Sequence, residues 1–164
     1  MDATHAHLLT NHIPILGSIF GVLLLIIGMV LRNKTAEIIA ISTILLASIF
    51  TIPVYLSGEE AEDKVESLQG VSEHELEEHE EHADLSLWLM LVGGGLALMT
   101  LASYKMAPKL TKTARISTLV VTGVAFLSLI PLADHGGKIR HSELRDGAAA
   151  PQEAVLEDDD DDND

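Results

Sequence analysis

Histidine is the residue type in this sequence that is best suited to carry chemistry. Eight histidines fall in three stretches, at 5–12, 74–82 and 135–141, and each stretch borders a long apolar run. Imidazole nitrogens bind haem iron, zinc, copper and nickel. The sequence has no cysteine, which excludes disulfides, thiolate metal sites, iron–sulfur clusters and c-type haem attachment. A fold that gathers the three stretches builds a multi-histidine site, whereas a fold that separates them leaves an exposed polar flank.

Both a b-type haem and a divalent metal ion fit these residues. A b-type haem needs one or two axial histidines from facing helices and cations for its propionates. The axial candidates are His12, His79, His135 and His141, and the cations are Lys138 and Arg140. For zinc or another divalent metal, the candidate ligands are His12, His79, His82, His135 and His141, beside many glutamates. His79 and His82 are three residues apart, so they can share one metal ion but cannot bracket a haem.

Four apolar runs must position these side chains. The runs are 13–31, 36–56, 85–104 and 116–133, and Glu37 is their only residue with a charged side chain at pH 7. Each run is about 20 residues long, which is the length that crosses a hydrocarbon core as a helix. We therefore expect an all-α transmembrane domain over residues 1–145, a four-helix up-down bundle made of two hairpins. No convincing internal repeat relates the two hairpins.

The distribution of charge predicts the orientation of this bundle. The two short loops at 32–35 and 105–115 contain six of the ten basic residues, and Glu37 is the only acid beside them. The other side contains four basic residues, 24 acids and all eight histidines, a net charge of −20 with neutral histidines. The positive-inside rule places both loops in the cytoplasm. We expect a multi-pass protein of the bacterial inner membrane with both termini in the periplasm.

The segment between the hairpins, 57–84, should hold two helical pieces. Ser57-Gly58 resembles a helix C-cap, and an amphipathic helix is expected over 59–68. Ser72 and Glu75 form a capping-box pattern, from which a helix can run through the histidines into the third span. On that helix a stripe of polar and small residues should face the bundle interior: His79, His82, Ser86, Gly93, Ala97 and Thr100. The acidic tail, 146–164, is expected to be disordered.

Glycines and prolines indicate where a cofactor could fit between the helices. Glycines recur on the first, third and fourth spans, where they either let helices pack closely or make room for a planar cofactor. Pro14, Pro53 and Pro131 lie near the outer ends of three helices. Proline can kink or widen a helix, so the outer end of the bundle is where a cofactor would fit.

The absence of certain motifs and the acidic charge argue against several function classes. The sequence has no phosphate-binding loop, no Rossmann glycine pattern and no carboxylate pair within a span, so no catalytic residue is predicted. An acidic chain does not bind nucleic acid through a basic surface. Secondary transport by a monomer is disfavoured because no span carries a charge near mid-membrane.

Short motifs along the chain resemble an uncharacterised group of small bacterial four-helix membrane proteins. The motifs lie in the same order from the first span to Arg145 and leave the acidic tail unmatched: His7-Leu8-Leu9-Thr10-Asn11-His12-Ile13-Pro14, Leu56-Ser57-Gly58-Glu59-Glu60-Ala61-Glu62, Gly70-Val71-Ser72 with His79-Glu80, and Gly136-Gly137-Lys138-Ile139-Arg140-His141-Ser142-Glu143. The resemblance implies a four-helix membrane protein of unknown function with a link to haem. It ranks His12, His79 and His141 above His135 as ligands. Arg140 is the charge partner expected for them from its position in the sequence.

Three functions follow as hypotheses. The first is binding of b-type haem or a metal at the outer face for electron transfer, with a periplasmic cytochrome or membrane respiratory complex as partner. The second is a non-catalytic subunit or scaffold, monomeric or oligomeric, whose acidic outer face docks a basic partner. The third is binding or sensing of a divalent metal by the His/Glu-rich segment 73–84.

Overall fold

The computed structural model describes residues 2–66 and 68–145, and these residues form helices and no strand. The helices are α1 (Ala3–Thr10), α2 (His12–Val30), α3 (Lys34–Val65), α4 (Glu73–Met106), α5 (Thr111–Lys138) and the short 3-10 helix η1 (Ser142–Leu144). The predicted all-α fold is confirmed. The acidic tail predicted to be disordered, 146–164, lies outside the described residues.

Four helical stretches are long and apolar enough to cross a membrane: Ala3–Val30, Lys34–Val65, Glu73–Met106 and Thr111–Lys138. Each contains one of the predicted spans to within one residue. Their outward faces carry large apolar side chains that are more than half exposed, such as Phe20, Trp88 and Leu127. Apolar surface of this extent is stable against lipid rather than water, which agrees with the four predicted spans.

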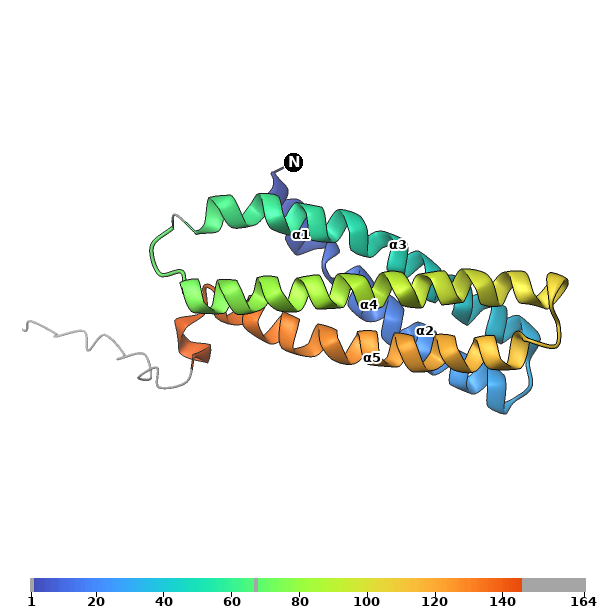
Figure 1. Ribbon diagram of the computed structural model, residues 1–164. Helices are drawn as coiled ribbons and strands as arrows, with labels where there is room; N and C mark the ends of the chain where they lie inside the picture. Colours follow the sequence, from blue (N-terminus) through green and yellow to red (C-terminus); the bar gives the residue numbers. More distant parts are fainter. Residues whose placement is uncertain (1, 67, 146–164) are drawn as a thin grey trace, which may run out of the picture.

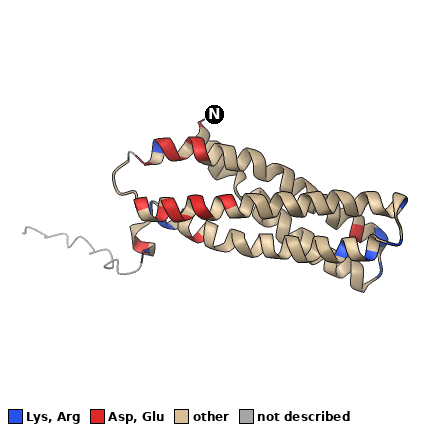
Figure 2. Cartoon of the chain, viewed as in Figure 1, with Lys and Arg blue, Asp and Glu red and all other residues tan. Residues whose placement is uncertain are grey.

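Figure 1 shows α2, α3, α4 and α5 side by side, with neighbours in the chain running in opposite directions. The turns from α2 to α3 and from α4 to α5 share one end, which we call the basic end. The loop from α3 to α4, helix α1 and η1 share the other, which we call the histidine end. Figure 2 shows most acidic residues gathered at the histidine end, and most lysines and arginines gathered at the basic end.

Helices α2 and α3 pack closely because α2 presents glycine at their contact. A Cβ added at Gly17 would lie 2.6 Å from the Cβ of Ala47, and one added at Gly21 would lie 2.5 Å from Cγ1 of Ile44. Atoms cannot approach so closely without displacement, so a larger residue would push the helices apart. For these glycines the structure supports the helix-packing interpretation.

Helices α4 and α5 are joined by a row of hydroxyl contacts. Ser86 and Ser128 lie 2.9 Å apart, as do Thr100 and Thr118, and the Ser103 hydroxyl donates to Thr111 over 3.0 Å. Hydrogen bonds between helices have few competitors in lipid, where water is absent. The predicted interior stripe of α4 is confirmed over its membrane part, because Ser86, Gly93, Ala97 and Thr100 are all buried.

One predicted helix boundary is wrong. Helix α3 does not end at Ser57-Gly58 but continues to Val65, so the expected separate helix over 59–68 is the last part of α3. Gly58 has no left-handed backbone, which among the described glycines occurs at Gly70, with φ of 83°. The second boundary is confirmed, since the Ser72 hydroxyl caps α4 by accepting from the Glu75 amide. From there α4 runs unbroken through the histidines into the membrane.

Candidate functional site

Four of the eight histidines meet at the histidine end and form what we call the imidazole cluster. They come from three helices: His7 from α1, His79 and His82 from α4, and His135 from α5. The ring centres of His7 and His79 lie 6.5 Å apart with an angle of 81° between the ring planes. The ring centres of His82 and His135 lie 5.2 Å apart. All four rings are half-buried.

One side of the cluster has the donors of a metal site. Ligand atoms of Glu78, His82 and His135 all lie within 4.8 Å of one another. A tetrahedral metal with bonds of about 2.0–2.1 Å spaces its ligand atoms roughly 3.4 Å apart. The three groups thus lie within about 1.4 Å of the spacing that one ion requires. In the described part of the chain, no other set of three such residues converges in this way.

Hydrogen bonds orient the two imidazoles of this group. Nδ1 of His135 lies 2.7 Å from a carboxylate oxygen of Glu75, and Nδ1 of His82 lies 2.8 Å from the carbonyl oxygen of Glu78. In each neutral ring, Nδ1 then carries the proton and donates it, which leaves Nε2 with a free lone pair. A carboxylate behind an imidazole also raises the basicity of that ligand. The group can bind a metal through two Nε2 atoms and one carboxylate.

His7 and His79 are held in a second and more symmetrical way. Nδ1 of His7 donates to the carbonyl oxygen of Val54 over 3.0 Å, and Nδ1 of His79 donates to that of Leu132 over 2.9 Å. Each ring also contacts a glycine that lies one helical turn after the residue whose carbonyl oxygen accepts its hydrogen bond. A Cβ at Gly58 would meet Cε1 of His7 at 3.1 Å, and a Cβ at Gly136 would meet Cε1 of His79 at 2.9 Å. Nε2 of both rings is thus free. A side chain at either glycine would crowd the ring that packs on it.

The two segments that hold these rings share a sequence pattern, although no internal repeat was predicted. It reads Ile-Pro, then Val or Leu, then three variable residues and Gly, at 52–58 and again at 130–136. In both copies the carbonyl oxygen of the residue after proline accepts a hydrogen bond from the imidazole Nδ1, and the glycine contacts the ring. This repeat is the signal by which His7 could have been linked to His79. His7, Glu75 and Glu78 were missing from the predicted ligands.

The remaining predicted site residues lie apart from the cluster. His12, Arg140 and His141 are exposed, and among the described residues neither His12 nor His141 has a ring contact with another histidine. Nδ1 of His141 lies 2.7 Å from a carboxylate oxygen of Glu143, and this hydrogen bond holds the pKa of the Glu143 carboxyl below its usual range. Lys138 pairs with Asp134 at 2.6 Å.

The structure therefore separates the predicted ligands. His79, His82 and His135 come together, whereas His12 and His141, which the resemblance favoured, do not join them. Comparison of the chain with protein families, with curated proteins and with solved structures gives no match. The geometry of the imidazole cluster is thus the basis on which a function can be proposed.

Proposed function

We propose that this protein binds a divalent first-row transition metal at the histidine end, with Glu78, His82 and His135 as ligands. The observation that carries the proposal is the convergence of these three groups from two helices to within 4.8 Å. Glu75 supports the site by accepting a hydrogen bond from Nδ1 of His135. This function is one of the metal-binding hypotheses drawn from the sequence. Its preferred ligands differ, because Glu78, His82 and His135 take the place of His12 and His141.

The donor set favours zinc among such metals. Two imidazoles and one carboxylate are ligands that zinc commonly takes in proteins, with a fourth position left for water or an incoming ligand. Imidazole also suits copper, nickel and iron, and the absence of thiolate disfavours copper(I). Because all three groups are half-buried, the fourth position would be open to exchange with solvent. Such a site suits acquisition or sensing of the metal better than a permanent structural role.

The proposal includes a location. The basic residues gathered at the other end favour that end as the cytoplasmic one, because positively charged loops are retained in the cytoplasm. The histidine end and both termini then face the periplasm of a bacterial inner membrane, and the four spans form an up-down bundle. Metal would reach the site from outside the cell membrane.

The experiment uses the purified full-length protein in detergent, stripped of metal and titrated with Co²⁺ and Zn²⁺. Co²⁺ in a tetrahedral site of nitrogen and oxygen ligands absorbs in the visible, and Zn²⁺ should displace it at one equivalent. Glu78→Gln and His82→Gln should weaken binding by more than about 100-fold, because loss of an outer partner alone weakens metal sites by 10–100-fold. Their controls are Glu77→Gln and His74→Gln, which change exposed neighbours on the same helix. Equal affinity in all four variants, or no stoichiometric binding, overturns the proposal.

A second candidate function is favoured by the separation of His7 and His79. Two imidazoles that bind one iron from opposite sides, with bonds of about 2.0 Å, have ring centres roughly 6.3 Å apart. The observed distance is 6.5 Å, and both Nε2 atoms are free. A b-type haem held there would serve electron transfer at the histidine end.

The two candidates are separable because their ligand sets do not overlap. Haem would give a Soret band in the protein as purified, and His7→Ala should abolish that band while leaving Co²⁺ binding intact. The matched control is His5→Ala, which removes an exposed imidazole from the same short helix. A colourless protein after gentle purification and addition of haemin rules out the haem candidate.

A further inference from the structure

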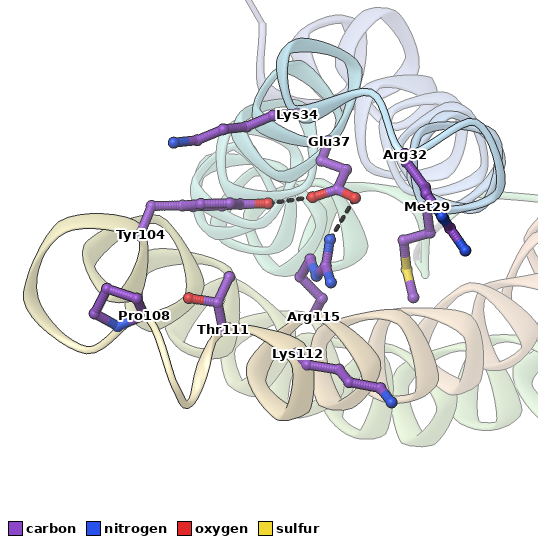
Figure 3. A pocket seen from close by; sticks show the side chains of 9 residues that line it. All are labelled: Met29, Arg32, Lys34, Glu37, Tyr104, Pro108, Thr111, Lys112 and Arg115. Carbon is purple, nitrogen blue, oxygen red and sulfur yellow. Dashed lines mark hydrogen bonds and ion pairs between the residues drawn. The ribbon is translucent and has the colours of Figure 1, made fainter.

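The basic end contains an open pocket between the two helix turns, with a volume of about 650 Å³. Figure 3 shows its lining, which comes from α2 and α3 on one side and from α4 and α5 on the other. Four cations line it, and they are Arg32, Lys34, Lys112 and Arg115. Its size is in the range of pockets that hold small ligands. This pocket is at the opposite end of the molecule from the imidazole cluster and plays no part in the proposed function.

The one acidic residue that lines the pocket, Glu37, already has hydrogen-bond partners. Glu37 is only 2% exposed, and its carboxylate accepts from the Tyr104 hydroxyl over 2.5 Å and from the Arg115 guanidinium. The other three cations have no ion pair with a described residue. Lys34 instead lies 5.2 Å from the centre of the Tyr104 ring. The residues that line the pocket thus have a net charge of three positive units. This charge favours binding of an anion.

Two further features point to an anion with several oxygen atoms. Nε of Arg115 is buried and has no hydrogen-bond partner among the described residues, and a buried unpaired donor costs stability. Helices α3 and α5 both begin at this end, at Lys34 and Thr111, so their positive dipole ends face the same region. A phosphate group supplies the oxygen acceptors and the negative charge that these groups lack.

Exposed apolar side chains beside the pocket favour a lipid as the source of that phosphate. Leu31 is 67% exposed, Met106 83% and Leu110 62%, and all three lie on the turns that form the pocket. At the boundary of a bilayer such side chains contact acyl chains while the pocket meets headgroups. We propose that the basic end binds the phosphate headgroup of an anionic glycerophospholipid. The site would fix the depth of the basic end in an anionic leaflet.

The test measures lipid binding to the full-length protein in detergent by native mass spectrometry. The probes are phosphatidylglycerol and phosphatidylcholine with identical acyl chains, and glycerol 3-phosphate is the soluble arm. The variant Arg32→Gln/Lys112→Gln removes two exposed lining charges and leaves the Glu37–Arg115 pair in place. Each charge near a membrane surface changes affinity by about fivefold, so phosphatidylglycerol should bind the doubly substituted variant about 25-fold more weakly.

The matched control is Lys105→Gln/Lys109→Gln, which removes two exposed charges from the same end but outside the pocket. The proposal is supported when this control retains the preference for phosphatidylglycerol and the pocket variant loses it, with phosphatidylcholine binding unchanged in both. It is overturned by equal losses in the two variants, by no preference between the lipids, or by glycerol 3-phosphate binding as tightly as the lipid. Unchanged phosphatidylcholine binding also shows that the pocket variant is folded.

Discussion

His135 lies between two carboxylates with different tasks. Its Nδ1 is 2.7 Å from a carboxylate oxygen of Glu75, and one of its ring nitrogens lies within 4.8 Å of ligand atoms of Glu78 and His82. Glu75 therefore orients the imidazole and increases its electron donation, while Glu78 can bind the metal directly. In the proposed site, two glutamates one turn apart on the same helix thus have different roles, Glu75 as a hydrogen-bond partner of His135 and Glu78 as a ligand.

Glu75→Gln tests this division. The amide can no longer balance the charge that the imidazole gains on binding metal, so we expect Co²⁺ affinity to fall by about 10–100-fold with one equivalent still bound. Titration followed by visible absorption measures it, and Glu73→Gln, at an exposed position of the same turn, is the control. Full loss of the site would instead make Glu75 a ligand.

At the basic end, the buried ion pair of Glu37 and Arg115 should cost more to break than to replace. Removing one partner of a buried pair typically costs about 3–5 kcal/mol, and because the Arg115 side chain is 23% exposed, we expect the lower end of that range. We expect Glu37→Leu to lower the thermal unfolding midpoint in detergent strongly. The double variant Glu37→Leu/Arg115→Met should recover most of the loss, because two apolar side chains of similar volume remove both charges. A double variant no more stable than the single one would contradict this account.

At the scale of single elements, α2 depends on α3 through glycine contacts. Gly21→Val places new atoms where Ile44 already lies, because a Cβ added at this glycine would be 2.5 Å from Cγ1 of Ile44. Overpacking of this kind costs about 1–3 kcal/mol. Gly95→Ala is the control, since an added Cβ there meets nothing within 4 Å. Thermal unfolding in detergent should separate the two, with the midpoint lowered for Gly21→Val alone.

Hydropathy and helix-capping rules were sufficient to predict the four spans and the start of α4, but they predicted neither α1 nor which histidines meet. The four spans follow from apolar length, and the start of α4 follows from Ser72. The choice of imidazoles depends on how each helix is rotated and on α1, a helix of eight residues too short to be anticipated. α1 packs on α3 through the Lys64–Asp2 ion pair at 2.8 Å and the bond from His7 to Val54, and this contact brings His7 inward while His12 stays exposed.

Gly58 illustrates the same limit. In the sequence, Ser57-Gly58 followed by acidic residues has the features of a helix C-terminus. In the structure the glycine lies within α3, where its missing side chain makes space for the ring of His7. A local rule cannot distinguish a glycine that ends a helix from one that admits a neighbour, because the neighbour comes from a distant part of the chain.

The whole molecule is electrically polar along its length, as Figure 2 shows. The proposed orientation is testable because the chain has no native cysteine. In intact cells, a membrane-impermeant maleimide should label Ser142→Cys at the histidine end, whereas Lys109→Cys at the basic end should react only after permeabilisation. Both positions are exposed, so access decides the result. The reverse pattern would place the metal site in the cytoplasm.

The length of α4 sets how the histidine end meets its surroundings. Its 34 residues extend about 51 Å, well beyond the roughly 30 Å of a hydrocarbon core. The 12 residues before the apolar run extend about 18 Å beyond it. On this stretch His82 lies about 4.5 Å and Glu78 about 10 Å beyond Leu85, the first residue of the run. The proposed ligands thus lie at the level of the headgroups, so an ion could reach them from water without crossing the acyl chains.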